Sequence, residues 1–203
     1  GITISTWVHC DKVNNVWERI FDFGQTAPGP YMFLTRFLRG VCFNGGDLVA
    51  ASVKPCPEGE WVHVAMSITG TQGGTLSSAG PRVYLNGELM GDGFISQTYK
   101  KLREWFATLD DPANYSHNFI AHSQFDADSD FGGSLSDFRI YKAALSEEEI
   151  IGLMCESLSE DEILRLARDK FLPAPNKIIT SDLILPSTLM EGKVSVAPSL
   201  LAK

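Results

Sequence analysis

Aromatic side chains that can stack on sugar rings gather in residues 91–117, and one further candidate, Trp17, lies near the N-terminus. Exposed Trp and Tyr rings bind sugars by their faces, and neighbouring amide and carboxylate groups bind the hydroxyls. The candidates for this chemistry are Trp105, Tyr99, Tyr115, His117 and Trp17. The same rings could instead hold residues 91–117 against a core, so the pattern predicts either a sugar-binding surface or a packed insertion.

Carboxylates alternate in the segment 125–132, and another carboxylate follows shortly after it. Oxygen ligands on turns suit Ca²⁺, and the candidates are Asp126, Asp128, Asp130 and Asp137. Counted from Asp126, Asp137 stands at the twelfth place of an EF-hand loop, but Phe131 stands at the sixth place, where that loop needs glycine. The segment is therefore no EF-hand, and it predicts either a looser calcium site or a solvated acidic turn.

Catalytic constellations are missing from the sequence. Retaining glycosidases need two carboxylates roughly 5–5.5 Å apart across the sugar bond. The clusters at 147–149 and 160–162 precede apolar helical stripes, where the helix dipole explains them. Glu18 and Asp22 share a face of a predicted strand, but no third carboxylate completes an acidic triplet. The four histidines are scattered, which leaves no Ser-His-Asp triad, so we expect no enzymatic activity within this chain.

The composition and net charge of the chain indicate which kinds of molecule it could bind. The 203 residues have 25 Asp and Glu against 17 Lys and Arg, a net charge of −8. Binding to nucleic acid rests on neutralising phosphates, so an acidic chain without a basic stripe is a poor candidate for nucleic acid or anionic lipid. No apolar run approaches the roughly 18 residues of a membrane-spanning helix, which predicts no membrane insertion. An acidic surface suits uncharged polysaccharides or cations.

Short alternating segments separated by turn residues predict an all-β fold that positions these candidates. We expect strands at 2–8, 17–23, 31–38, 40–44, 48–53, 60–67, 82–90 (a hairpin about Asn86-Gly87), 119–123 and 134–141. Ser146 and the three glutamates after it then predict a helix start, with Ile150, Ile151 and Met154 as its apolar stripe. This many short strands favours a sandwich of antiparallel sheets.

The stretch FGGSLSDFRIYKAALSEEEIIGLM, residues 131–154, resembles the closing motif of laminin-G-like domains of the concanavalin A-like jelly-roll superfamily. Other segments resemble that family in the expected order: ITISTWV (2–8), EWVHVAMS (60–67), RVYLNGELM (82–90) and FIAHS (119–123). The resemblance implies a jelly roll of two antiparallel sheets over residues 1–155, followed by a short helical segment. It also implies that one or two opening strands precede Gly1, as in a piece of a longer protein.

The family resemblance carries expectations for single residues. It implies a structural Ca²⁺ at the rim of the sandwich, with Asp137 as a ligand. It also implies that Trp7 and Trp61, in core strands, are buried and that His63 is a structural strand residue. The cysteines are Cys10, Cys42, Cys56 and Cys155, which we expect to be mostly buried thiols; a Cys42–Cys56 bridge stays open.

The character of the chain changes after residue 155. Residues 156–175 predict a short helix, 163–171, and a Pro-rich linker. Residues 176–203 are similar to the start of a bacterial immunoglobulin-like domain. Such pairs occur in secreted or cell-surface bacterial enzymes, and they resemble the accessory region of arabinofuranosidase-like glycoside hydrolases. The resemblance implies a non-catalytic carbohydrate-binding module that binds polysaccharide beside a catalytic domain of the same protein. The alternatives are a structural spacer that packs on that catalytic domain and a protein-binding adhesion domain.

Overall fold

The computed structural model describes residues 1–12, 15–25, 29–44, 47–51, 54–69, 80–92 and 99–171. The chain forms two compact units, Gly1–Met154 and Cys155–Lys203. The described part of the second unit is mainly the helix α3 (Glu160–Phe171), which contains the predicted helix 163–171. The predicted Pro-rich linker and immunoglobulin-like segment lie outside the described residues. None of the helices in the described part of the chain is long and apolar enough to cross a membrane.

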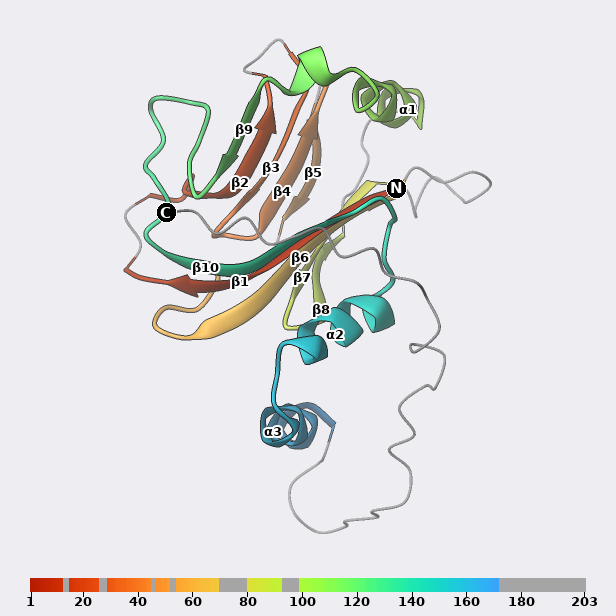
Figure 1. Cartoon of the computed structure of the whole chain (residues 1–203). Helices are drawn as coiled ribbons and strands as arrows, with labels where there is room; N and C mark the ends of the chain where they lie inside the picture. Colours follow the sequence, from red (N-terminus) through yellow and green to blue (C-terminus); the bar gives the residue numbers. More distant parts are fainter. Residues whose placement is uncertain are drawn as a thin grey trace. The chain divides into compact units, whose positions relative to one another are not determined.

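Two antiparallel sheets form the first unit, and they face each other as the layers of a sandwich (Figure 1). Sheet A has the strand order β10 (Gly133–Tyr141), β1 (Ile2–Cys10), β6 (Trp61–Thr69), β7 (Gly80–Leu85) and β8 (Glu88–Asp92). Sheet B has the order β5 (Asp47–Ala51), β4 (Arg39–Phe43), β3 (Tyr31–Thr35), β2 (Arg19–Gly24) and β9 (His117–Ile120). The predicted all-β jelly-roll sandwich of two antiparallel sheets is therefore confirmed.

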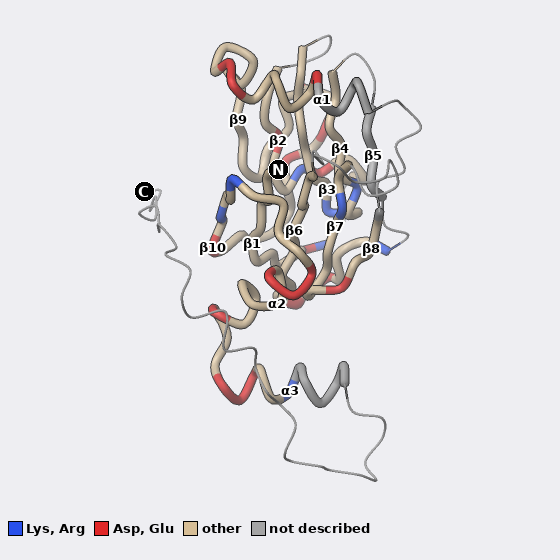
Figure 2. The backbone as a smooth tube through the Cα atoms, turned by 90° about the vertical axis from the view of Figure 1, so that its right-hand side faces the viewer, with Lys and Arg blue, Asp and Glu red and all other residues tan. Residues whose placement is uncertain are grey.

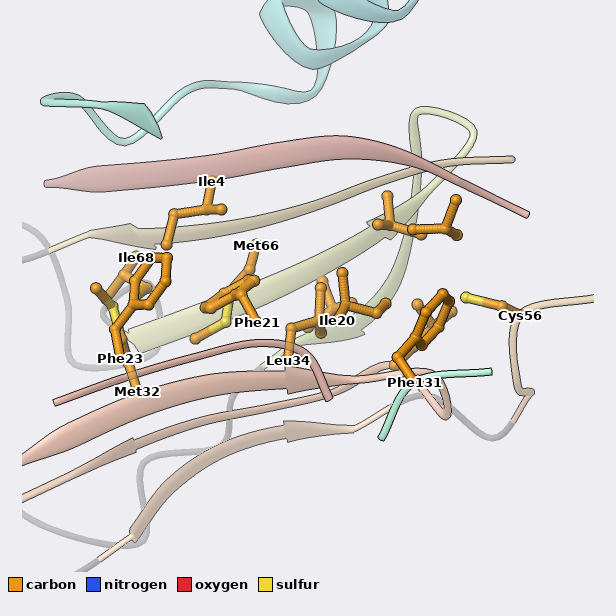
Figure 3. Packing of buried hydrophobic residues seen from close by; sticks show 14 of the residues in the cluster. Ile4, Ile20, Phe21, Phe23, Met32, Leu34, Cys56, Met66, Ile68 and Phe131 are labelled. Atoms are coloured by element: carbon orange, nitrogen blue, oxygen red, sulfur yellow. The ribbon is translucent and has the colours of Figure 1, made fainter. Parts of the chain in front are cut away.

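The hydrophobic core fills the space between the two sheets (Figure 3). Alternate residues of β1 and β6, such as Ile4 and Met66, point inward because successive side chains of a strand lie on opposite faces. Sheet B contributes large side chains from β2 and β3, among them Phe21 and Leu34. Phe138 of β10 packs edge-on against the Phe21 ring, with centroids 6.2 Å apart. The alternate side chains, which point away from the core, form the outer face of each sheet.

The helix α2 (Glu147–Glu156) covers part of the outer face of sheet A (Figure 1). Its predicted start is confirmed, because Glu149 N donates to Ser146 Oγ (3.3 Å) and Ser146 N donates to Glu149 Oε2 (2.7 Å), a capping box. Figure 2 shows acidic residues at the first turns of both α2 and α3, where they complement the helix dipole. Ile150 of α2 packs with Ala65 and Tyr84 of the sheet.

At two positions only glycine fits the backbone, because of a positive φ or a close approach of another strand. Asn86 and Gly87 have φ values of 49° and 76°, so the predicted Asn-Gly hairpin turn between β7 and β8 is confirmed. Gly133 has a φ of 157° at the first residue of β10, and a Cβ there would lie 2.1 Å from the carbonyl oxygen of His9. The Gly-Gly turn of the closing motif therefore lets β10 approach β1 closely.

Candidate functional site

Trp17 lies in the turn that precedes β2, and it remains 37% exposed. Asn15 holds this turn, because its Oδ1 accepts a hydrogen bond from Trp17 N at 2.9 Å. The guanidinium carbons of Arg19 and Arg39 lie 5.5 and 5.1 Å from the centroid of the indole ring. Two cations within about 6 Å of one aromatic ring hold it in place by cation–π attraction. Trp17 is therefore an exposed indole ring whose position is held by Asn15, Arg19 and Arg39.

Arg19 is the centre of a buried polar network on the outer face of sheet B. Its Nε donates to Asp22 Oδ2 at 3.3 Å, and its Nη2 lies 2.9 Å from Asp128 Oδ2. Its guanidinium carbon lies 3.8 Å from the centroid of Phe33, which stacks beneath it. Burial lowers the pKa of Arg19, and the two carboxylates oppose that shift. The network ties β2 to the loop 121–132 and fixes the shape of this face.

Asp22 is fully buried and accepts several hydrogen bonds from the loop 121–132. Gln124 Nε2 donates to Asp22 Oδ1 at 2.5 Å, and Gln124 N and Ser123 Oγ donate to Oδ2 at 3.3 and 3.4 Å. Burial raises the pKa of Asp22, while Arg19 and the Gln124 donors oppose the rise. These contacts leave Asp22 as a support for the loop rather than a group that faces a ligand.

Two buried polar atoms of this face have no hydrogen-bond partner among the described residues. They are the Nε of Arg39, a donor, and the Oε1 of Gln124, an acceptor. A buried polar atom without a partner costs about 1–3 kcal/mol, so such atoms in a folded protein need an explanation. We name this face the Trp17 surface and define it by Trp17, Arg19, Arg39, Gln124 and Phe125.

Stacked aromatic rings on β3 and β4 support the Trp17 surface. Tyr31 lies parallel to Phe43 across the strand pair, with centroids 4.7 Å apart, and it stacks on Phe33 at 5.9 Å. Phe125, from the loop 121–132, meets the edge of Tyr31 at 5.7 Å. Tyr31 and Phe33 are buried, so they act as packing beneath the surface rather than as exposed stacking rings.

Trp105 does not have the exposed face that sugar stacking needs. The helix α1 (Tyr99–Thr108) inserts this side chain into the core between the sheets, where it is fully buried. Its Nε1 donates to the carbonyl oxygen of Tyr31 at 3.4 Å. The prediction of Trp105 as a sugar-binding residue is therefore wrong, and the packed alternative is the one that the structure shows for this side chain.

The other predicted aromatic residues do not join Trp17. Tyr115, at the end of the 3₁₀ helix η2 (Pro112–Tyr115), is half-buried against the core; its hydroxyl lies 3.2 Å from Thr108 Oγ1, and burial raises its pKa to about 12. His117 is exposed and pairs with Gly24, at the opposite end of β2 from Arg19, roughly 16 Å along the strand. The side chain of Tyr99 lies outside the described residues. Of the four candidates whose side chains are described, Trp17 alone lies on this surface.

Asp128 and Asp126, two of the predicted calcium ligands, lie on the loop 121–132, where Asp128 shares the Arg19 guanidinium with Asp22. Asp128 is held by Arg19, and it also accepts a hydrogen bond from Ser123 Oγ at 3.0 Å. The guanidinium therefore already supplies the positive charge that a cation would bring to Asp22 and Asp128. Asp126 is exposed on the same loop.

Asp130 and Asp137 are likewise held by side chains of the protein. Asp130 Oδ1 lies 2.5 Å from His122 Nδ1. Asp137 has a φ of 54° where the β1–β10 register shifts, and it accepts a hydrogen bond from Arg139 Nε at 2.7 Å. Within the described ranges no three His, Cys, Asp or Glu side chains group as a metal site. The described carboxylates therefore do not fit Ca²⁺ well, and calcium binding stays a prediction of the family resemblance.

A second aromatic surface lies on the outer face of sheet A, on β1 and β6. Trp61 is 48% exposed and lies 5.7 Å, between ring centroids, from His9; Trp7 is half-buried and meets His63 at 5.5 Å. The expectation that Trp61 is buried is wrong, because Val62 and Val64 take the inward positions of β6 and turn Trp61 outward. We name these four residues the Trp61 surface.

His63 is buried, as expected for a structural strand residue, and its pKa predicts a pH-dependent stability. Burial lowers the pKa of His63 from 6.5 to about 4; nearby Asp137 opposes this shift and Arg139 adds to it. Between pH 4 and pH 6.5, His63 therefore binds a proton in the unfolded chain but not in the folded chain. We expect full stability above pH 6.5 and a loss of about 3 kcal/mol as the pH falls to 4. Urea unfolding at several pH values should show a shallower pH slope for His63→Gln; equal slopes would contradict this origin.

Comparisons with known proteins agree with this architecture. A laminin G family model, described as the concanavalin A-like lectin/glucanases superfamily, matches residues 1–151. Domain 4 of AbnA, an extracellular GH43 arabinanase from Geobacillus stearothermophilus solved with arabinotriose, is similar with 20% identity and a TM-score of 0.52. That similarity covers 75% of this chain and 65% of that chain.

Two other similar structures are more distant. A sialidase from Trypanosoma rangeli is 15% identical, with a TM-score of 0.49, over 77% of this chain and 23% of that chain. A SAP-like pentraxin from Limulus polyphemus is 16% identical, with a TM-score of 0.43, over 74% and 67%. No curated protein sequence matched the chain. The family match over residues 1–151 and the two antiparallel sheets together show that this chain belongs to the concanavalin A-like lectin/glucanase superfamily, as the laminin-G-like motifs predict.

Proposed function

We propose that this chain is a non-catalytic carbohydrate-binding module and that its ligand binds at the Trp17 surface. The observation that carries the proposal is an exposed indole that two arginines hold in place on the outer face of sheet B. A buried donor and a buried acceptor of this face lack partners among the described residues, as do Trp7 Nε1 and His63 Nδ1 on the Trp61 surface. The similarity to an arabinanase domain solved with arabinotriose supports a neutral plant polysaccharide, such as arabinan, as the ligand class.

The chemistry of the Trp17 surface suits a sugar. The indole face stacks on the apolar face of a sugar ring, while Arg39 Nε donates to a hydroxyl and Gln124 Oε1 accepts from one. Satisfying these buried atoms adds affinity and orientation together. The network of Arg19, Asp22 and Asp128 holds the loop in place before the sugar arrives, which lowers the entropy lost on binding.

The carboxylates near this surface support a role without catalysis. A glycosidase needs one carboxylic acid that donates a proton and a second carboxylate at the sugar bond. Asp22 and Asp128 both bind Arg19, and Glu18 binds Arg36, so each of these acids is tied to a cation of the protein. We further propose that the parent protein is a secreted or cell-surface bacterial glycoside hydrolase in which this module keeps the catalytic domain on its polysaccharide.

Trp17→Ala tests the proposed surface. Removing an aromatic anchor from the centre of a binding site costs about 2 kcal/mol or more, so we expect affinity for arabino-oligosaccharides to fall about 30-fold or further. Isothermal titration calorimetry measures this affinity. Trp61→Ala is the matched control, because it removes an exposed indole from the other sheet and should leave the affinity unchanged. Loss of binding by Trp61→Ala with normal binding by Trp17→Ala would move the site to sheet A.

The Trp61 surface favours a second candidate function, an interaction domain that packs on a catalytic domain of the same protein. Trp61, Trp7 and His9 form an aromatic patch on a sheet face, and aromatic residues are enriched in the centres of protein interfaces. Under this function the chain binds no glycan, and Trp61→Ala weakens its association with the catalytic domain supplied as a separate chain. Glycan binding that depends on Trp17 would count against it.

A further inference from the structure

Cys10 and Cys56 meet at one end of the core. Cys10 is the last residue of β1, and Cys56 lies in the segment that leads into β6; both are buried in the same cluster. Gly59 N donates to the carbonyl oxygen of Cys10 at 2.8 Å, and the backbone of Cys10 pairs with that of Glu58 in an isolated parallel β-bridge. Figure 3 shows Cys56 beside Phe131 at this end of the core. The backbone itself therefore holds the segment of Cys56 against the end of β1.

Arg36 fixes the two cysteine segments from the other side. Cys56 N donates to the carbonyl oxygen of Arg36 at 2.8 Å, and Arg36 Nη2 donates to the carbonyl oxygen of Asp11, the residue after Cys10, at 3.0 Å. Arg36 is fully buried, so these contacts form inside the protein. One residue thus binds next to both cysteines and keeps their segments together.

The thiols of Cys10 and Cys56 lie in the same buried cluster and act on each other's ionisation. Their interaction lowers the pKa of Cys10 and raises that of Cys56, and Arg36 adds to the lowering at Cys10. All four cysteines are free thiols in the structure, and Cys10, Cys42 and Cys56 are buried, so the bridge between Cys42 and Cys56 that the sequence left open is not present there. Cys42 is buried in β4, where burial alone raises its pKa, whereas the segment of Cys56 lies against Cys10 at the end of β1.

We propose that Cys10 and Cys56 form a disulfide when the protein folds in the presence of a small-molecule disulfide. The Cys10 thiolate attacks one sulfur of the oxidant, whose S–S bond breaks and releases one thiolate. Cys56 then attacks the mixed disulfide at the Cys10 sulfur and releases the second thiolate. The two cysteines lose two protons and two electrons, and the oxidant is reduced to two thiols.

The proposed bridge would join the end of β1 to the segment before β6 and would close the chain between residues 10 and 56. Cross-linking residues far apart in sequence stabilises a protein mainly by restricting its unfolded state. Because both thiols are buried in the fold, the bridge forms during folding, and reagents reach it slowly afterwards. A disulfide of this kind persists in an oxidising compartment and not in a reducing cytosol.

Oxidative refolding tests the proposal. The unfolded, reduced chain is refolded with oxidised and reduced glutathione, alkylated in denaturant and analysed by mass spectrometry. We expect two of the four cysteines to resist alkylation and a proteolytic digest to link the peptides of Cys10 and Cys56. The oxidised protein should melt roughly 5–15 °C higher than the reduced protein.

Two variants keep the test decisive. In Cys56→Ala, all the remaining cysteines should be alkylated, and the oxidised and reduced samples should melt at the same temperature. Cys42→Ala replaces another buried cysteine, and it should keep both the disulfide and the difference in melting temperature between oxidised and reduced protein. Four alkylated cysteines after oxidative refolding of the folded wild type would overturn the proposal. A digest that links Cys42 to Cys56 would overturn it as well. Neither result depends on glycan binding.

Discussion

Replacing Arg36 by Met lowers the free energy of unfolding by about 3–5 kcal/mol, as expected when one partner of a buried ion pair is removed. Arg36 and Glu18 are both fully buried, and Arg36 Nη1 donates to Glu18 Oε2 at 3.1 Å. Glu18 also accepts from Gly132 N at 3.2 Å and from Asn15 N at 2.9 Å. The variant therefore keeps a buried carboxylate that has lost its cation. Urea unfolding at pH 7 measures the loss.

The double variant Arg36→Met, Glu18→Gln is the control for this prediction. It removes the buried charge together with its partner, so part of the lost stability should return, and the double-mutant cycle gives the coupling between the two side chains. A single Arg36→Met variant that loses less than about 1 kcal/mol would show that the pair behaves like an exposed one. Equal losses in the single and double variants would show that packing, and not charge, explains the effect.

Replacing Trp105 by Ala lowers the free energy of unfolding by about 3–5 kcal/mol, because it removes the largest fully buried side chain of the core. The ring contacts Phe106 edge-on at 5.1 Å and holds α1 against the sandwich. The variant also leaves the carbonyl oxygen of Tyr31 without the indole donor. Urea unfolding measures the loss, and calorimetry on the folded variant measures its glycan affinity.

The two measurements separate packing from binding at Trp105. Trp105→Phe keeps most of the buried volume, so it should lose less stability than Trp105→Ala, and folded samples of both should bind glycan as the wild type does. A variant with normal stability and lost affinity would restore Trp105 as a sugar-binding residue. A Trp105→Ala variant with unchanged stability would contradict its burial in the core.

Local sequence signals predict much of the fold. Asn86-Gly87 supplies the positive φ values of a tight hairpin, and Ser146 with Glu149 forms a capping box at the predicted helix start, within four residues of chain. The alternation of Ile2–Cys10 gives the inward and outward faces of β1. In each case the residues that determine the local structure are neighbours in the sequence, so the sequence pattern is sufficient to predict it.

Long-range contacts explain why the candidate site could not be predicted in the same way. Arg19 binds Asp128 across more than one hundred residues, and nothing in either local sequence indicates the pairing. A shift in register between Arg19 and Phe21 places Arg19 and Asp22 on the same outer face, against the simple alternation of a strand. Whether an aromatic ring is buried also depends on its partners: α1 buries Trp105, whereas Trp61 starts β6 on the outward side.

Calorimetric titration of the wild-type chain with arabinan oligosaccharides and a panel of other neutral polysaccharides tests the central claim most directly. The account predicts binding to at least one of these glycans. It also predicts that binding persists in EDTA, because Arg19, His122 and Arg139 hold three of the four candidate metal-ligand aspartates. No heat of binding with any glycan, from a chain shown to be folded, would contradict a carbohydrate-binding module. Loss of binding in EDTA would contradict the account, because it would show that the site needs a metal ion.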